Sequence, residues 1–220
     1  MNLRSFVRFF AVSLFALSLS GASLAAPKDG DAPKYPEIKL VKIQEFDPTL
    51  SDAKAIHDSL ASIEKTLTDA NKGLAATLNL PETTSVDDCL GELKKRANGK
   101  LRVAMKGRVP KLEATDAIPS DVQAGIDTVN KMMDDLGSGL EQVEAMPPKV
   151  AGLVSSAKAF PGQLNVDLLK KNNVAPTELP KIGKTLGADI KAIEATPERI
   201  KGVTDQTMNL FNKVQSTFAN

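Results

Sequence analysis

Two regular stripes of apolar residues constrain the fold of this 220-residue chain more than any other feature. In each stripe the apolar side chains recur at alternating spacings of four and three residues, the heptad pattern of a helix that packs along another helix. The later stripe comprises Val122, Ile126, Val129, Met133, Leu136, Leu140 and Val143, and the earlier one comprises Ile56, Leu60, Ile63, Leu67, Ala70 and Leu74. We therefore expect two long helices that pack together in the manner of a coiled coil. The earlier should begin with Ser51 as its N-cap, and the later at Pro119 and Ser120.

Prolines divide the rest of the chain into shorter helical segments, because proline ends one helix and favours the first turn of the next. The expected segments are 85–97, 148–159, 162–171, 179–195 and 197–218. Thr196 would be the N-cap of the last helix and Pro197 its first helical residue. The chain has no tryptophan and one tyrosine, so its core must be largely aliphatic, which suits helices better than a β-sandwich or barrel. We predict a mainly α fold, an antiparallel helical bundle with proline-hinged helix hairpins.

The stretch between residues 100 and 115 departs from this helical pattern. It follows the turn signal Asn98-Gly99, and apolar and polar residues alternate on both sides of Gly107. This alternation favours one small β-hairpin. The competing interpretation is that the preceding helix continues through Met105.

A weak internal repeat relates residues 136–153 to residues 186–203. Leucine, glycine, glutamate, alanine and proline coincide at equal offsets in the two segments. In each copy the proline, Pro147 or Pro197, would break one helix and begin the next. Duplication of a helical hairpin is the favoured interpretation, and two similar corners that arise from composition alone are the alternative. The uneven spacing does not support a solenoid.

The N-terminus has the features of a cleavable secretory signal peptide. Arg4 and Arg8 accompany an apolar stretch that ends at Leu19, and small residues follow. We expect cleavage near Ala25, so that residues 1–25 are the signal peptide.

A proline-rich segment over residues 26–50 follows, and we interpret it as an extended leader to a helical bundle domain over residues 51–220. Ile38, Leu40 and Ile43 would allow part of the leader to lie along the core.

The predicted signal peptide indicates the compartment in which the protein is expected. No cysteine lies near the predicted cleavage site, and no later stretch is long and apolar enough to span a membrane. We expect a periplasmic or secreted protein, soluble after cleavage. Removal of Arg4 and Arg8 lowers the 28 basic residues by two against 27 acidic ones, so the net charge becomes −1. That balance argues against bulk polyanion binding.

No catalytic or metal-binding constellation is evident. Cys89 is the only cysteine and is expected to lie in the core, with an intermolecular disulfide as the alternative. His57 is the only histidine, too few for a multi-histidine zinc site. Gly137-Ser138-Gly139 lies inside a heptad stripe and lacks the strand and the lysine of a phosphate loop, so close packing of two helices explains it better.

Two pairs of adjacent carboxylates, Asp87-Asp88 and Asp134-Asp135, are expected to be solvated, because neighbours on a helix point about 100° apart. We therefore expect no catalytic, cofactor-binding or metal-binding residues, and no cofactor.

The most unusual charge feature is a basic stretch without an intervening acid. It comprises Lys94, Lys95, Arg96, Lys100, Arg102, Lys106, Arg108 and Lys111. The acidic segment that follows comprises Glu113, Asp116, Asp121, Asp127, Asp134, Asp135, Glu141 and Glu144. Internal pairing of the two segments is the favoured interpretation, and contact with an anionic lipid or polysaccharide is the alternative. Nucleic acid is not an expected partner, because the basic stretch has no aromatic residue to stack on bases.

These features together predict an exported, non-enzymatic helical protein of the bacterial envelope that acts through protein–protein contact or as a structural element. Its partner would be another envelope protein or a second copy of the chain. The first alternative is a peripheral amphipathic protein that binds lipid or another anionic surface. The second is a periplasmic chaperone of the holdase type, which would need exposed apolar patches.

Overall fold

The computed structural model describes residues 35–219. The predicted signal peptide, its cleavage site near Ala25 and the first part of the predicted leader lie outside the described residues. Within residues 35–219, no helix combines the length and the apolar character that crossing a membrane requires.

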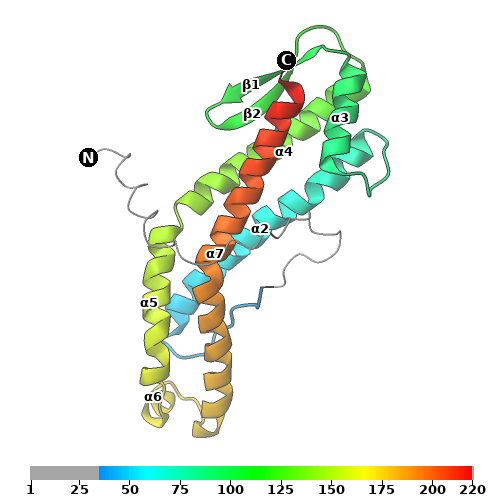
Figure 1. The fold of residues 1–220 in the computed structure, drawn as a ribbon. Helices are drawn as coiled ribbons and strands as arrows, with labels where there is room; N and C mark the ends of the chain where they lie inside the picture. The colour runs from blue at the N-terminus through cyan, green and yellow to red at the C-terminus, as the bar shows by residue number, and fades with distance from the viewer. Residues whose placement is uncertain (1–34, 220) are drawn as a thin grey trace, which may run out of the picture. The chain divides into compact units, whose positions relative to one another are not determined.

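The described chain is mainly α-helical with one small antiparallel hairpin, which confirms the predicted fold class (Figure 1). The elements are α2 (Asp47–Thr77), α3 (Val86–Ala97), β1 (Leu101–Lys106), β2 (Val109–Ala114), α4 (Ser120–Glu144), α5 (Pro147–Gln163), α6 (Val166–Lys171), a 3-10 turn (Pro176–Glu178) and α7 (Leu179–Phe218). The β-hairpin expected near 100–115 is therefore present, and the alternative of a continued helix is wrong.

The two heptad stripes pack against each other, because α2 lies along α4. Their residues, among them the fully buried Leu60 and Met133, lie in a core that α3, the hairpin and the second half of α7 complete, and Leu67 is partly buried there. We call this the upper core, after its place in Figure 1. Helix α3 lies within the expected segment 85–97, and Ser85 is its N-cap: the Ser85 hydroxyl accepts a hydrogen bond from the backbone N–H of Asp88 (3.1 Å).

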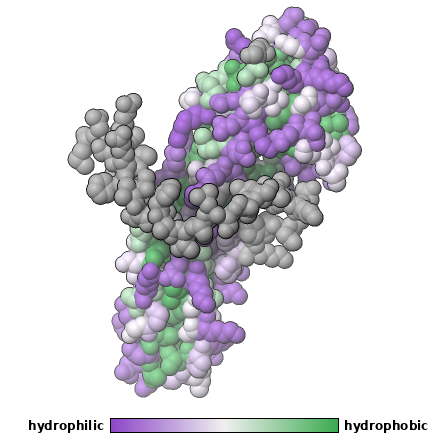
Figure 2. All heavy atoms as spheres, viewed as in Figure 1, coloured by the Kyte–Doolittle hydropathy of each residue, from purple (hydrophilic) through white to green (hydrophobic). Residues whose placement is uncertain are grey.

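A second, lower core lies at the other end of α2 and α7. Residues 38–46 pack there against the start of α2, α5, α6 and the first half of α7. Phe46 and Phe160 stack with ring centroids 4.4 Å apart. Figure 2 shows apolar residues reaching the surface along this part of the molecule, between hydrophilic ones. The leader thus contributes buried side chains, Ile38 and Ile43, whereas Leu40 is 52% exposed.

Helix α7 corrects the expected break at Thr196 and Pro197. It runs without interruption over 40 residues, about 60 Å at 1.5 Å per residue, and it bends where its two halves meet (Figure 1). Thr196 does not cap a helix; its hydroxyl donates to the carbonyl oxygen of Ala192 (3.1 Å). Pro197 lies on the exposed side, while Ile193 and Val203 on either side of it are buried, so packing in both cores holds the helix together across the proline.

Two other helix boundaries also differ from the expected ones, because the helices concerned tolerate a proline. Helix α5 continues through Pro161, and α2 begins at Asp47 rather than after a Ser51 cap. Pro48 lies in the first turn of α2, where a missing N–H costs nothing. At Pro147, by contrast, α4 ends and α5 begins, as expected. The two copies of the repeat therefore adopt different local structures, and their common origin stays a prediction.

Candidate interaction site

The basic stretch runs from the end of α3 through the β-hairpin, and its side chains are engaged within the chain. Seven of the eight bases have a partner among residues 35–219. The pairs are Lys94 with the carbonyl oxygen of Thr217 (2.6 Å), Lys95 with Glu92 (3.8 Å), Arg96 with Glu92 (2.9 Å) and Asp121 (3.3 Å), Lys100 with Asp116 (3.6 Å), Arg102 with Glu113 (2.7 Å), Arg108 with Glu144 (2.5 Å) and Lys111 with Asp134 (2.5 Å). In the described part of the chain, only Lys106 lacks such a partner.

Five of these seven bases pair with acids between residues 113 and 145, which supports internal pairing of the basic and acidic segments. The Arg108 guanidinium donates two hydrogen bonds to Glu144 and thereby lowers the pKa of that carboxyl group. The pKa of Asp116 is also lowered, first by the backbone N–H of Ala117 and then by Lys100. Exposed pairs such as these add little stability, but they neutralise the local charge.

The outer edge of β2 is covered by α4. The Asn130 side chain accepts a hydrogen bond from the N–H of Leu112 (2.8 Å) and donates one to its carbonyl oxygen (2.9 Å). Lys111, whose side chain is 15% exposed, reaches the carbonyl oxygen of Asn130 (2.7 Å) and Asp134 on the same helix. Pro110 removes the neighbouring outward donor on this edge. One helix and one proline thus cover the β2 edge at Pro110 and Leu112.

Among the residues that the structure describes, none covers the outer edge of β1 in this way. The N–H of Thr115 donates a hydrogen bond to the carbonyl oxygen of Lys100. In an antiparallel pair, every second residue from Lys100 along β1 therefore directs its backbone N–H and C=O groups toward β2. The residues between them direct these groups outward. Val103, which pairs in register with Leu112, and Met105 therefore direct their backbone N–H and C=O groups away from β2. Within residues 35–219 we find no hydrogen-bond partner for these groups.

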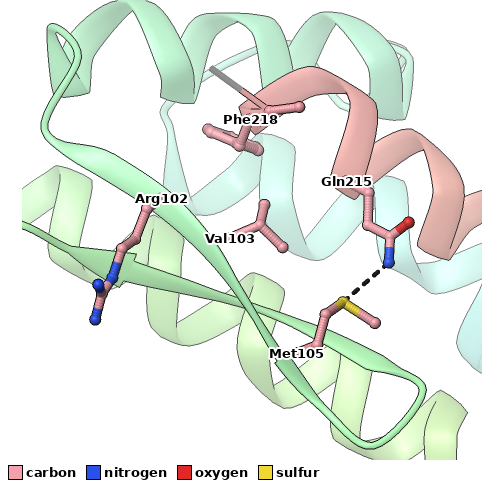
Figure 3. A pocket seen from close by; sticks show the side chains of 6 residues that line it. Arg102, Val103, Met105, Gln215 and Phe218 are labelled. Atoms are coloured by element: carbon pink, nitrogen blue, oxygen red, sulfur yellow. Dashed lines mark hydrogen bonds between the residues drawn. The ribbon is translucent and has the colours of Figure 1, made fainter.

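A shallow groove of about 350 Å³ lies beside this open edge (Figure 3). Its lining comes from β1 and the C-terminal end of α7, and consists of Arg102, Val103, Met105, Gln215, Phe218 and Ala219. Gln215 Nε2 donates to Met105 Sδ (2.9 Å), while the Arg102 guanidinium points away from Phe218 toward Glu113 (Figure 3). Met105 is 49% exposed, one of three large apolar side chains exposed in the described chain.

His57 lies apart from this site, at the crossing of α2 and α7. Its Nε2 is 2.9 Å from the Thr196 hydroxyl, which already donates to a carbonyl oxygen, so His57 acts as the donor. Burial, and then the nearby charge of Arg199, lower the pKa of His57. Arg199 donates to both Glu64 oxygens (2.8 and 2.7 Å), and its guanidinium carbon is 4.2 Å from the centre of the Tyr35 ring. This cluster joins two helices.

The other residues singled out by sequence have structural partners. Cys89 is buried, and this burial raises the pKa of its thiol. Asp87 pairs with Lys213 (2.7 Å) and Asp135 with Lys131 (2.6 Å). Among residues 35–219, no three potential metal ligands gather at one place.

The two glycines of Gly137-Ser138-Gly139 allow close packing, although the neighbours are not two helix backbones. A Cβ atom on Gly137 would lie 2.5 Å from Val109 of β2, and one on Gly139 would lie 2.8 Å from Ile63 of α2.

Sequence reasoning missed the open edge and its groove. The one available signal was Pro110, which marks β2 as an edge strand and has no counterpart in β1. Comparison of the chain with family models, with curated proteins and with solved structures finds no match.

Proposed function

We propose that this chain is an exported, non-enzymatic helical protein of the bacterial envelope that acts through contact with another protein. The contact surface is the end of the bundle where β1 meets the C-terminal end of α7. The observation that carries the proposal is the open groove at this place, which exposes Met105 beside backbone groups that have no hydrogen-bond partner within residues 35–219. Exposed apolar side chains beside a groove are typical of protein interaction sites.

The charge distribution favours a protein partner over an anionic surface. A peripheral lipid-binding protein would present free bases to the headgroups. Here seven of the eight bases already bind groups of the same chain. Binding a lipid surface would require these pairs to open or to be shared.

Site-specific photo-crosslinking tests the proposal. A benzophenone amino acid is placed at Met105 in the full chain, and cells that export it are irradiated. We expect a discrete protein adduct from this position. Val166 is the matched control, because it is also apolar and exposed (38%) but belongs to the other end of the bundle. The proposal is wrong if Met105 yields no more adduct than Val166, or if the chain floats with anionic vesicles at low salt and only lipid is labelled.

A further inference from the structure

The outward backbone groups on the two edges of the hairpin differ in their hydrogen-bond partners. On β2, the Asn130 side chain binds both outward backbone groups of Leu112, and Pro110 has no N–H to direct outward. On β1, the outward N–H and C=O groups of Val103 and Met105 have no partner within residues 35–219. An open strand edge is a template for another extended chain. Within residues 35–219, the fold covers the middle of the β2 edge and leaves the middle of the β1 edge available for such a chain.

We infer that β1 binds an extended, acidic segment of the partner protein, which adds to the hairpin as a third strand. This inference rests on the proposed function and specifies the chemistry of the contact. Main-chain hydrogen bonds to Val103 and Met105 hold the segment, and its alternate side chains supply the specificity.

Successive side chains of an added strand lie on opposite faces of the sheet, so the surroundings on each face indicate which residues the segment carries. Cross-strand neighbours lie on one face of a sheet, so side chains opposite Val103 and Met105 lie beside the groove with Phe218. These positions favour an apolar residue. The positions between them lie on the face of Arg102, which already pairs with Glu113, and of Lys106. Lys106 has no acidic partner in the described chain, so an acidic residue fits beside it. The segment therefore alternates apolar and acidic residues.

The same charges disfavour a second copy of the chain as the occupant. Strand β1 carries Arg102 and Lys106 and no acid. Antiparallel pairing of two β1 edges about Val103 places Lys100 opposite Lys106, and pairing about Ala104 places Arg102 opposite Lys106. Like charges directly opposite each other destabilise a strand pair.

Peptide binding to the full chain tests the inference. The probe is a fluorescein-labelled heptapeptide, Glu-Val-Glu-Ile-Glu-Val-Glu, and the control is the same peptide with lysine for each glutamate. Fluorescence anisotropy should show saturable binding of the acidic probe and binding at least about tenfold weaker for the control. The variants are Val103→Pro, which removes an outward N–H, and Val103→Ala, which keeps it. We expect Val103→Pro to bind at least about tenfold more weakly than Val103→Ala.

A second measurement keeps the test independent of variant folding. In the unsubstituted chain, the probe should slow amide hydrogen exchange at Val103 and Met105. The inference is overturned if the probe does not bind, if these amides stay unprotected, or if the two Val103 variants bind equally. It is also overturned if light scattering shows a dimer that Val103→Pro dissociates, because the occupant is then a second copy. If the crosslink from Met105 persists in Val103→Pro, the proposed function stands and only the strand-addition mode falls.

Discussion

At the scale of single residues, two glycines at corresponding positions of the internal repeat have opposite surroundings. A Cβ atom on Gly137 would lie 2.5 Å from Val109 Cγ2, whereas one on Gly187 would meet no atom within 4 Å. Both lie inside helices, where alanine is favoured over glycine by about 0.5–1 kcal/mol. We expect Gly187→Ala to stabilise the chain by about that amount. Gly137→Ala should destabilise it by about 1–3 kcal/mol, because Val109 must move.

Urea unfolding followed by circular dichroism measures both free energies of unfolding. The two substitutions are chemically identical, so each is the control for the other. A shift in the same direction for both would contradict the packing described for Gly137.

His57 makes a testable contribution to the pH dependence of stability. Its pKa in the folded chain lies below the ordinary value of 6.5, because it is buried and close to Arg199, while Asp58 and Glu64 only partly oppose this effect. The unfolded chain therefore binds the proton at a higher pH than the folded chain does. Stability should be fully present above about pH 6.5 and should fall as the pH drops from there toward the folded pKa, by at most about 1.4 kcal/mol per pH unit.

The measurement is the urea midpoint at a series of pH values between about pH 8 and pH 5, in the original chain and in His57→Gln. Glutamine can still donate to Thr196 but does not titrate. We expect a shallower decline in the variant, and equal slopes would show that His57 is not the group responsible.

At the scale of elements, Asn130 joins α4 to the edge of β2. Asn130→Ala would leave the N–H and C=O of Leu112 without these partners, so we expect a loss of about 1–3 kcal/mol in the free energy of unfolding. Faster amide exchange at Leu112 should accompany the loss. Gln123→Ala is the matched control on the same helix, since the exposed Gln123 side chain hydrogen-bonds to the exposed Asp127. A cost for Asn130→Ala no larger than the cost for Gln123→Ala would contradict this role.

The elements that were predicted well are those encoded by local patterns. The heptad stripes of α2 and α4, the short helix expected over 85–97 and the alternation around Gly107 each depend on residues close in sequence. The wrong boundaries are the breaks expected near Pro161 and Pro197, and the expected start of α2 after a Ser51 cap. Pro197 does not end α7, because buried residues on both sides of it hold the helix in two cores, and that packing cannot be read from local sequence.

The candidate site was beyond sequence reasoning for the same reason. The basic stretch was identified, and its favoured internal pairing agrees with contacts such as Arg108 with Glu144, which are 36 residues apart. The open edge of β1 is defined only by contrast with the edge that Asn130 covers, and the groove needs Phe218 from the far end of the chain. Neither proximity follows from spacing or composition.

At the scale of the whole described chain, residues 35–46 act as a strap on the lower core. The N–H of Lys39 donates to Asp189 (3.2 Å), a buried carboxyl group whose pKa is raised by burial. The N–H of Gln44 donates to Asn172 (2.8 Å), and Glu45 pairs with Lys171 (2.6 Å). These bonds hold Ile38, Val41, Ile43 and Phe46 against α5 and α7. The part of the leader that the structure describes is therefore structural.

Because α2 and α7 pass through both cores, the two cores should unfold together. Phe46 lies in the lower core and Met133 in the upper core, and both are fully buried. We expect Phe46→Ala to cost about 3–5 kcal/mol and Met133→Ala about 2–5 kcal/mol, from lost burial and the cavity left behind. Each substitution should lower the midpoint of one shared unfolding transition, measured by far-ultraviolet circular dichroism. Amide hydrogen exchange is measured at Leu169, which reports on the lower core, and at Leu90, which reports on the upper core. Exchange at both amides should accelerate equally in either variant. If Phe46→Ala accelerates exchange only at Leu169, the cores unfold separately, and the continuity of α7 across Pro197 does not couple them.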